Sequence, residues 1–271
     1  CQGDGGGWGV MLMAADIGNT QTVIGVFEGE DLEAHWRIAT EGHRSPDEVG
    51  IWCAALLELR GMSLSEVEAV IVSSDVPPLV RSYRRFAEDL MGVPFYSVSS
   101  GIKTGLEIHY DDPTALGSDR IVNSVAAVRY YGTPAIIVDF GTATTVEVVG
   151  RGANYLGGAL MPGVYISLDT LASRAAKLQN VDLEVRAPKA VATNTPDAIR
   201  SGFIYGYAGA VDSLIRRMGE ELAASEPVDG LQVIATGGPA PVIVPHCHEI
   251  RKLDPDLTLK GLRVLYEINA K

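Results

Sequence analysis

The sequence predicts an α/β protein made of two similar halves, each of which opens with a meander of strands and continues with helices. The main observation is a repeated motif: Asp16 to Val23 read Asp-Ile-Gly-Asn-Thr-Gln-Thr-Val, and the stretch that begins at Asp139 reads Asp-Phe-Gly-Thr-Ala-Thr-Thr-Val. Each copy lies between two apolar runs, which is the pattern of strand, tight turn and strand. A nearly pure apolar run over 134–138 precedes Asp139, and such a run is typical of a buried central strand.

The first half is expected to contain a three-stranded meander and then two helices, each followed by a strand. Its first helix has a strong start signal, because Ser45 can cap it, Pro46 suits its first turn and Glu48 completes a capping box. Gly61 and Gly92 are placed to end the two helices. The expected strands cover residues 10–15, 22–27, 32–39, 67–73 and 94–98, and the expected helices cover residues 45–59 and 77–90.

The second half repeats the meander after a loop-like stretch over 101–113 and a helix that enters this half. Asn194 and Pro196 mark the start of the longest helix, as cap and first-turn residue. The expected strands cover residues 134–138, 144–149, 155–160 and 231–235, and the expected helices cover residues 116–131, 163–178, 195–222 and 258–268.

The length of 271 residues is enough for one large domain or two of ordinary size. We expect an N-terminal half over 11–115 and a C-terminal half over 116–271, without a low-complexity linker between them. Residues 1–10 do not look like the start of a domain, and we expect them to be non-native or disordered.

Composition excludes several classes of function. The formal net charge of −12 argues against general binding to nucleic acid or to anionic membranes, which requires a basic face. No apolar run approaches the roughly 18 residues of a membrane span. The three cysteines are far apart and form no C-x-x-C pair, so we expect a reduced, cytoplasmic protein.

The two Asp-x-Gly turns are the first candidates for chemistry. Glycine lets the backbone approach a ligand closely, and the N–H groups of such a turn can bind phosphate oxygens. An aspartate beside bound phosphate is normally there to hold a metal ion or its water. The alternative is a pair of ordinary hairpin turns, but two copies 123 residues apart, each between apolar runs, favour a ligand site.

Three further stretches could carry chemistry, and each has a structural alternative. The segment 117–120 could supply a carboxylate that accepts a proton and an arginine that binds an anion, or it could simply cap a helix. The two glycines after the apolar strand 231–235 could lie against an adenine ring, or could form a plain strand–helix turn. The segment 157–163 shapes the backbone, either in a purely structural role or in direct contact with a ligand. The run His246-Cys247-His248 fits no standard zinc spacing, so we interpret it as ordinary surface.

Taken in order, these motifs closely resemble the type III pantothenate kinases, members of the acetate and sugar kinase/Hsc70/actin superfamily. The resemblance covers about residues 11–270 and is far more specific than any single motif. The matching stretches are Asp16 to Val23, Ser73-Ser74, Val76-Pro77-Pro78, Lys103-Thr104-Gly105-Leu106, Tyr110, Asp112-Pro113, Gly117 to Asn123, Asp139 to Thr145, Tyr155-Leu156-Gly157-Gly158, Pro162-Gly163, Thr236-Gly237-Gly238 and Asp254 to Leu262.

The resemblance implies two duplicated ribonuclease H-like, actin-like halves with mixed sheets and a nucleotide site in the cleft between them. It implies ATP-dependent phosphorylation of pantothenate to 4'-phosphopantothenate, the first step of coenzyme A synthesis, by a homodimer. Asp119 would be the general base, and Arg120 would be a candidate for binding the pantothenate carboxylate. Asp139 would hold a monovalent cation, K⁺ or NH₄⁺, and Asp16 would hold Mg²⁺ through phosphate or water.

The remaining implied contacts are with the two substrates. Residues implied to bind ATP are Asp16, Ile17, Gly18, Asn19, Thr20, Gln21, Thr22, Val23, Thr142, Gly237 and Gly238. Residues implied to bind pantothenate are Tyr110, Gly117, Ser118, Asp119, Arg120 and Thr195. The long helix over 195–222 is the candidate for the dimer contact.

The chain departs from the family pattern at a few positions, and none of them removes a proposed catalytic group. Ser118 stands where alanine is usual, Asp75 where an apolar residue is common, Pro239 where leucine is common, and Ala15 where a larger apolar residue is frequent. Two alternatives stay open: a kinase of another small hydroxylated substrate such as a sugar, and a catalytically inactive regulatory protein on the same fold.

Overall fold

The chain divides into two compact units in the computed structural model, which describes residues 11–270 except 75, 100, 175–180 and 186–188. The expectation for residues 1–10 therefore lies outside the described residues. The first unit comprises Cys1–Thr104, Gly117–Val122 and Thr258–Lys271, and the second comprises Gly105–Leu116 and Asn123–Leu257.

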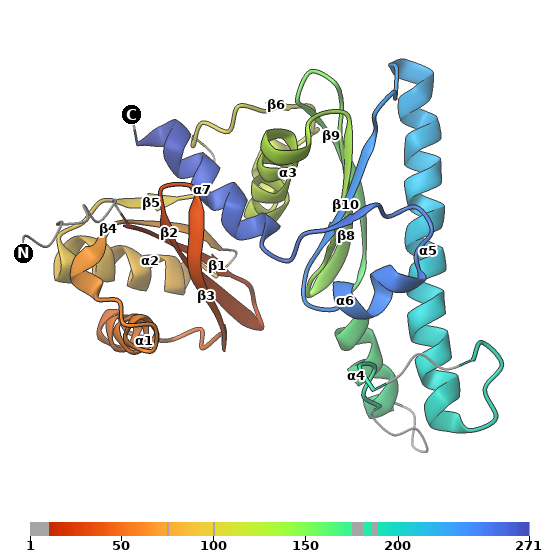
Figure 1. Ribbon diagram of the computed structural model, residues 1–271, viewed down its shortest axis with the longest axis horizontal. Coiled ribbons are helices and arrows are strands. Elements are labelled where there is room, and N and C mark those ends of the chain that lie inside the picture. The colour runs from red at the N-terminus through yellow and green to blue at the C-terminus, as the bar shows by residue number, and fades with distance from the viewer. Residues whose placement is uncertain (1–10, 75, 100, 175–180, 186–188, 271) are drawn as a thin grey trace, which may run out of the picture. The chain divides into compact units, whose positions relative to one another are not determined.

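The first unit is built on a five-stranded mixed sheet (Figure 1). Its first three strands pair antiparallel, which confirms the predicted meander, and the other two lie parallel to the first strand. In spatial order the strands are β3 (Asp31–Ala39), β2 (Gln21–Glu28), β1 (Met11–Ile17), β4 (Val67–Ser74) and β5 (Phe95–Ser97).

Two helices cover one face of this sheet, α1 (Pro46–Glu58) and α2 (Pro77–Arg85), as Figure 1 shows. The predicted capping box is present: the Ser45 hydroxyl accepts the Glu48 N–H at 3.3 Å, and the Glu48 carboxylate accepts the Ser45 N–H at 2.7 Å. The core beneath is apolar and fully enclosed, and its most buried members include Met13, Ile17, Val26, Leu57, Val72 and Ala87.

The second unit repeats this plan in a six-stranded sheet. Three antiparallel strands again form a meander, and the next strand again pairs parallel to the first of them. In spatial order the strands are β11 (Lys252–Leu253), β10 (Gln232–Thr236), β7 (Ala135–Phe140), β8 (Ala143–Val149), β9 (Asn154–Pro162) and β6 (Glu107–Ile108). The predicted class, two mixed α/β halves of the same design, is confirmed.

The longest helix, α5 (Thr195–Ser225), runs alongside the second sheet (Figure 1). Its apolar side chains share one core with β7, β8 and β10, while Asn194 caps its start by accepting the Asp197 N–H at 2.9 Å. The other helices are α3 (Ser118–Tyr131), α4 (Val164–Arg174), the short α6 (Ala240–Ile243) and α7 (Leu257–Asn269).

Several elements differ from the sequence expectations. The strand β11 was not expected, and the helix expected over 77–90 is an α-helix only to Arg85 and continues as a π-helix over Phe86–Met91. The stretch 101–113 was expected to be loop, yet it contains β6, because His109 donates its N–H to the Tyr155 carbonyl at 2.9 Å and extends an edge of the sheet. The last helix belongs to the first compact unit, where Leu259 lies directly over Gly25 of β2. Such contacts between residues far apart in sequence leave no local pattern.

None of the helices in the described part of the chain is both long and apolar enough to cross a membrane.

Candidate functional site

The first Asp-x-Gly turn connects β1 and β2, and Asp16 lies half-buried at the end of β1, beside Ser73 of β4. The Gly18 N–H closes the turn on the Gln21 carbonyl at 3.0 Å. The turn exposes its next residues, including Asn19 and Thr20, to solvent. Exposed polar side chains and backbone N–H groups are the groups with which a turn can bind phosphate.

Neighbouring strands hold this turn in shape. The Thr22 hydroxyl lies 2.8 Å from the Thr40 hydroxyl, and the Thr40 N–H donates to the Thr20 carbonyl at 3.0 Å. On the other side, the Ser74 hydroxyl donates to the Ile17 carbonyl at 3.1 Å. The turn is therefore fixed from β3 and β4 while its tip stays open.

The segment 117–120 forms the entry to α3 within the first unit. The Ser118 hydroxyl lies 2.9 Å from the hydroxyl of Ser73, and both side chains are buried. This pair accounts for the serine at a position where alanine is usual, because a buried hydroxyl is tolerated when it has a partner. Since Ser73 is also the cross-strand neighbour of Asp16, the start of α3 is tied to the end of β1.

Asp119 is half-buried in the first turn of α3, and one of its carboxylate oxygens accepts the Arg120 N–H at 2.8 Å. The capping role considered from the sequence is therefore real, and it fixes the carboxylate in orientation. Arg120 is only 6% exposed, so its guanidinium is not a solvated surface group. Burying a guanidinium costs free energy unless the charge is paired, and the geometry of a guanidinium is well suited to binding a carboxylate.

The second Asp-x-Gly turn connects β7 and β8 in the second unit. Asp139 is half-buried, and its Oδ2 accepts the side-chain N–H of Asn123 at 2.8 Å. Thr142 lies exposed in the turn, and its carbonyl accepts the Gly163 N–H at 3.1 Å.

Two glycines allow the backbone to close around this second turn. A methyl group at Gly163 would lie 2.2 Å from the Thr142 carbonyl oxygen, and one at Gly237 would lie 2.4 Å from the Phe140 carbonyl oxygen and 2.6 Å from Asp139 Oδ1. Gly237 also has a φ of +97°, in the region that favours glycine. The Phe140 carbonyl oxygen and Asp139 Oδ1 therefore lie close together beside Gly237. Oxygen ligands are what hard cations such as K⁺ and Mg²⁺ take. Gly238 follows, exposed, at the end of β10.

Tyr110 lies in the second unit against a buried tyrosine. Its ring meets the ring of Tyr155 edge to face with centroids 6.1 Å apart, and it lies beside Gly157, whose φ of +105° is in the region that favours glycine. The Tyr155 hydroxyl in turn donates to the carboxylate of Glu147, which is 1% exposed. A buried carboxylate needs such a donor, so the tyrosine pair is held from within the sheet.

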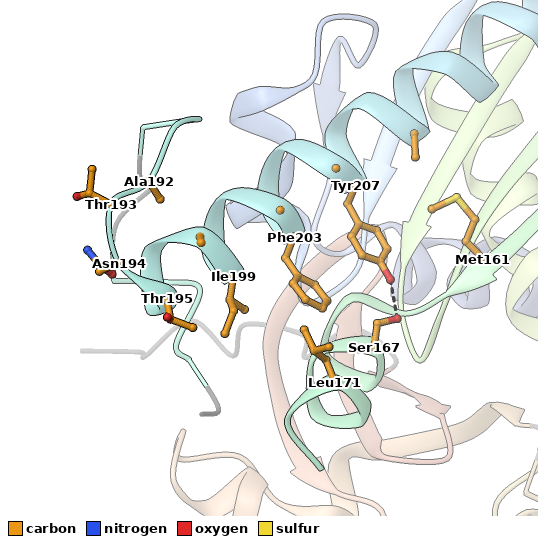
Figure 2. A pocket seen from close by; sticks show the side chains of 14 residues that line it. Met161, Ser167, Leu171, Ala192, Thr193, Asn194, Thr195, Ile199, Phe203 and Tyr207 are labelled. Atoms are coloured by element: carbon orange, nitrogen blue, oxygen red, sulfur yellow. Dashed lines mark hydrogen bonds between the residues drawn. The ribbon is translucent and has the colours of Figure 1, made fainter. Parts of the chain in front are cut away.

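Thr195 lines a cavity of about 870 Å³ beside α4 and α5 (Figure 2). The cavity is mainly apolar and includes Phe203, Leu171 and Met161, and the Ser167 hydroxyl lies 2.7 Å from the Tyr207 hydroxyl at its wall. The exposed Thr195 stands at the helix start, where backbone N–H groups lack helical partners.

The run His246-Cys247-His248 has a structural explanation. The buried carboxylate of Asp212 accepts the backbone N–H groups of His248 and Glu249 at 2.8 and 3.0 Å, which fixes the turn. Burial raises the pKa of the Cys247 thiol to about 12, and the Asp212 charge adds to the rise, so the thiol stays protonated at neutral pH. No cluster of metal ligands occurs among the described residues, here or elsewhere.

Sequence reasoning gave no role to three residues that the geometry adds to these sites. Asn123 binds Asp139, and Tyr155 contacts the ring of Tyr110. Glu147 in turn binds the hydroxyl of Tyr155. Asn123 lies one helical turn after Asp119 on α3, a spacing that could have indicated a shared face. Glu147 lies among the valines of β8, and a lone acid between buried apolar neighbours is a signal of a buried polar contact.

Comparison with known proteins identifies the relatives of the chain. The family model for type III pantothenate kinase matches residues 12–217. A curated type III pantothenate kinase of Rubrobacter xylanophilus is 64% identical over 260 residues, which cover 96% of this chain and 98% of the relative.

Solved structures agree with the fold at much lower sequence identity. The (R)-2-hydroxyglutaryl-CoA dehydratase component A of Acidaminococcus fermentans is similar with a TM-score of 0.53 at 13% identity, covering 97% of this chain and 100% of that one. The ROK hexokinase of Thermus thermophilus is similar with a TM-score of 0.51 at 14% identity, with the same coverage. These likenesses establish a two-domain, actin-like α/β fold.

Proposed function

Because the chain belongs to the type III pantothenate kinase family, we propose that it transfers a phosphoryl group from ATP to the terminal hydroxyl of pantothenate, with Asp119 as the proton acceptor. The observation that carries this assignment is the half-buried carboxylate of Asp119, which a backbone N–H holds at 2.8 Å beside the buried Arg120. A fixed carboxylate can accept the proton of a substrate hydroxyl as that oxygen attacks phosphorus.

The first turn is the proposed site for the ATP phosphates. Its support is the combination of a half-buried Asp16 with a glycine turn whose tip, at Asn19 and Thr20, is open to solvent. The residues act by positioning and by donating hydrogen bonds to phosphate oxygens, which is where most catalysis of phosphoryl transfer arises. Asp16 would hold Mg²⁺ through its water or through phosphate, and a bound Mg²⁺ neutralises charge on the phosphates.

Asp139 is the proposed monovalent cation site, and Thr142 a proposed contact to ATP. The donor set fits a cation with oxygen ligands, because Asp139 Oδ1 and the Phe140 carbonyl oxygen lie close together beside Gly237. Asn123 holds the other carboxylate oxygen and so orients the first. Gly237 and Gly238 would also let an adenine ring lie against the backbone.

Pantothenate is proposed to contact Tyr110, Thr195 and the residues 117–120. Arg120 suits the carboxylate of this substrate, because a guanidinium offers a paired set of donors. Tyr110 offers a ring that Tyr155 and Glu147 hold in place.

A homodimer formed along α5 is the proposed assembly. The support is the face of α5 at Gly202 and Gly206, where a side chain would meet nothing within 4 Å, next to the apolar cavity. Neighbouring Leu160 and Ile166 are 59% and 45% exposed, so apolar surface continues beyond the cavity. Gly206→Arg should halve the mass measured by light scattering, whereas Glu220→Arg, farther along the helix, should not. A Gly206→Arg protein with the mass of a dimer would reject α5 as the contact.

ATP turnover with pantothenate, measured with and without K⁺, tests the proposed activity. Turnover should require pantothenate, should not occur with a panel of sugars, and should fall without K⁺. Asp119→Asn should lower turnover by roughly 10²-fold or more, as expected for loss of a general base. Near-normal turnover in a folded Asp119→Asn protein would reject its role, and phosphorylation of a sugar instead would reject the substrate.

A further inference from the structure

A second cavity, of about 330 Å³, lies in the first unit and has a basic lining. It is formed by the segment that precedes α1 and by one side of α2. Its lining residues are Gly42, His43, Arg44, Pro46, Pro78, Arg81, Ser82 and Arg85. None of these described lining residues is acidic, although the chain as a whole carries a net charge of −12.

Three guanidinium groups of this cavity, which we call the arginine pocket, are available to a ligand. Among the described residues, none forms a hydrogen bond or ion pair with the side chain of Arg81. Arg85 pairs with Asp89 at 3.3 Å, but both side chains are more than 60% exposed, and surface pairs of this kind are weak. Arg44 stacks on the ring of Trp52 at 5.0 Å, which leaves the edge of its guanidinium for hydrogen bonds.

One nearby acid, Glu48, is engaged elsewhere. It accepts the Ser45 N–H at 2.7 Å as part of the capping box of α1. The hydrogen bonds to Ser45 contribute most to lowering the pKa of Glu48, and the charge of Arg44 contributes less. The neighbouring Arg84 provides a contrast on the same helix: it pairs with Glu88 at 3.4 Å and covers the ring of Phe95 at 4.8 Å, and it does not line the pocket.

We propose that the arginine pocket binds a small phosphate-bearing anion, of the size of pyrophosphate or a simple phosphate ester. Arginine forks match the geometry of phosphate oxygens, and three arginines that line one cavity favour a multiply charged anion over a single carboxylate. The cavity lies at the small end of the range for ligand sites, which excludes a whole nucleotide. A basic pocket in an acidic protein also concentrates the local positive potential that attracts such a ligand.

The pocket is connected to the first Asp-x-Gly turn through one short segment. Thr40, which holds Thr20 and Thr22 by hydrogen bonds, is followed two residues later by the pocket residues Gly42 to Arg44. An anion bound to residues 42–44 would therefore also restrain Thr40, which supports the turn, without occupying the turn itself. The proposed site is separate from the proposed ATP and pantothenate contacts.

Titration of the full-length protein with pyrophosphate tests the proposal, with Trp52 as a local fluorescent probe. Pyrophosphate should give a saturable change in emission that is lost in Trp52→Phe, and sodium acetate at equal ionic strength should give none. Arg81→Ala should weaken binding roughly tenfold or more, because it removes charge-assisted hydrogen bonds, whereas Arg84→Ala should change it less than about twofold.

Arg84→Ala is the matched control, because it removes the same charge from the same helix outside the pocket. Equal weakening by both variants would show general electrostatic attraction and would overturn the proposal. Tight binding of acetate, or a response that does not saturate, would also overturn it. If Arg81→Ala does not fold, Arg85→Ala, at another exposed position of the pocket, takes its place with the same expected result.

Discussion

The two Asp-x-Gly turns look alike in sequence but are supported in different ways. The first is held by side-chain and main-chain hydrogen bonds from neighbouring strands, such as the 2.8 Å contact between Thr22 and Thr40, and its tip is exposed. The second is packed closely against backbone on one side, because Gly163 and Gly237 allow main chain to approach where any side chain would collide, although its tip at Gly141 and Thr142 is exposed as well. The same motif is therefore supported by hydrogen bonds in one unit, which we call the open turn, and by close backbone packing in the other, which we call the enclosed turn.

The pairing of the strands sharpens this contrast. In the first hairpin Ile17 pairs with Thr22, and in the second Phe140 pairs with Thr144, so the second loop is one residue shorter. Aligning the two motifs on their aspartates matches Thr22 with Thr145, but the structural counterpart of Thr22 is Thr144. The two turns thus differ in length as well as in support.

The largest effect is expected from a methyl group placed against the enclosed turn. Gly163→Ala should lower the free energy of unfolding by about 3 kcal/mol, because the new carbon would lie 2.2 Å from the Thr142 carbonyl oxygen and the backbone must move. Gly18→Ala is the counterpart in the open turn, where the nearest atom is 3.2 Å away, and should cost about 1 kcal/mol or less. Urea denaturation measures both, and equal costs would remove the distinction between the turns.

Removing the amide that holds Asp139 should have the next largest effect. Asn123→Ala leaves Asp139 Oδ2 without the bond that now measures 2.8 Å, and a lost partner of a charged group costs about 2 kcal/mol. The variant should also require more K⁺ for half-maximal turnover, because the carboxylate is no longer oriented. An unchanged K⁺ dependence would argue against Asp139 as the cation ligand.

The two threonines at equivalent positions should respond with opposite sign. Thr22→Val breaks the contact with Thr40 and should cost about 1 kcal/mol. Thr144 Oγ1 is buried without a hydrogen-bond partner in the described part of the chain, so Thr144→Val should stabilise the protein by up to about 1 kcal/mol. Thermal unfolding of the two variants side by side would test this, and destabilisation by Thr144→Val would contradict it.

Ser118→Ala tests the link between α3 and the strand beside the first turn. It restores the residue usual in the family but leaves the buried Ser73 hydroxyl without the contact at 2.9 Å, so a loss of about 1 kcal/mol is expected. The KM for pantothenate should change less than about twofold, since the hydroxyl points to Ser73. A large rise in KM with unchanged stability would instead show that the Ser118 hydroxyl itself, and not only the backbone of this segment, contacts pantothenate.

The smallest effect on stability is expected at the open tip. Asn19 is exposed and lies between strands, so Asn19→Ala should change the free energy of unfolding by less than about 0.5 kcal/mol. If the tip binds ATP phosphates, the KM for ATP should nonetheless rise several-fold. An unchanged KM for ATP would move the phosphate site away from this turn.

Much of the fold was predictable because its signals are local. The capping box at Ser45, the start of α5 after Asn194 and the apolar run of β7 each depend on residues close together in the chain. The strand β6 was missed because it has two residues and depends on main-chain bonds to β9. The place of α7 in the first unit was missed because Leu259 finds its partner at Gly25, more than two hundred residues earlier.

The residues of the candidate site likewise divide into those that a local motif indicates and those that only tertiary contacts reveal. Asp16, Asp119 and Asp139 were predictable because motif spacing points to them directly. Their supports were not, since Asn123 reaches Asp139 only through the packing of α3 on β7, and Glu147 meets Tyr155 only across two strands. The burial of Arg120 likewise follows from tertiary packing, which no local sequence pattern indicates.

The position of α7 also has a consequence for synthesis on the ribosome. The second unit is encoded almost without interruption, so nearly all of its core is available once residue 257 has emerged. The first unit begins the chain, yet its sheet lacks the cover of Leu259 over Gly25 until the final helix has been made. The packing of the first unit is therefore completed only after the second unit has been synthesised, and until then Gly25 in its sheet lacks the contact with Leu259.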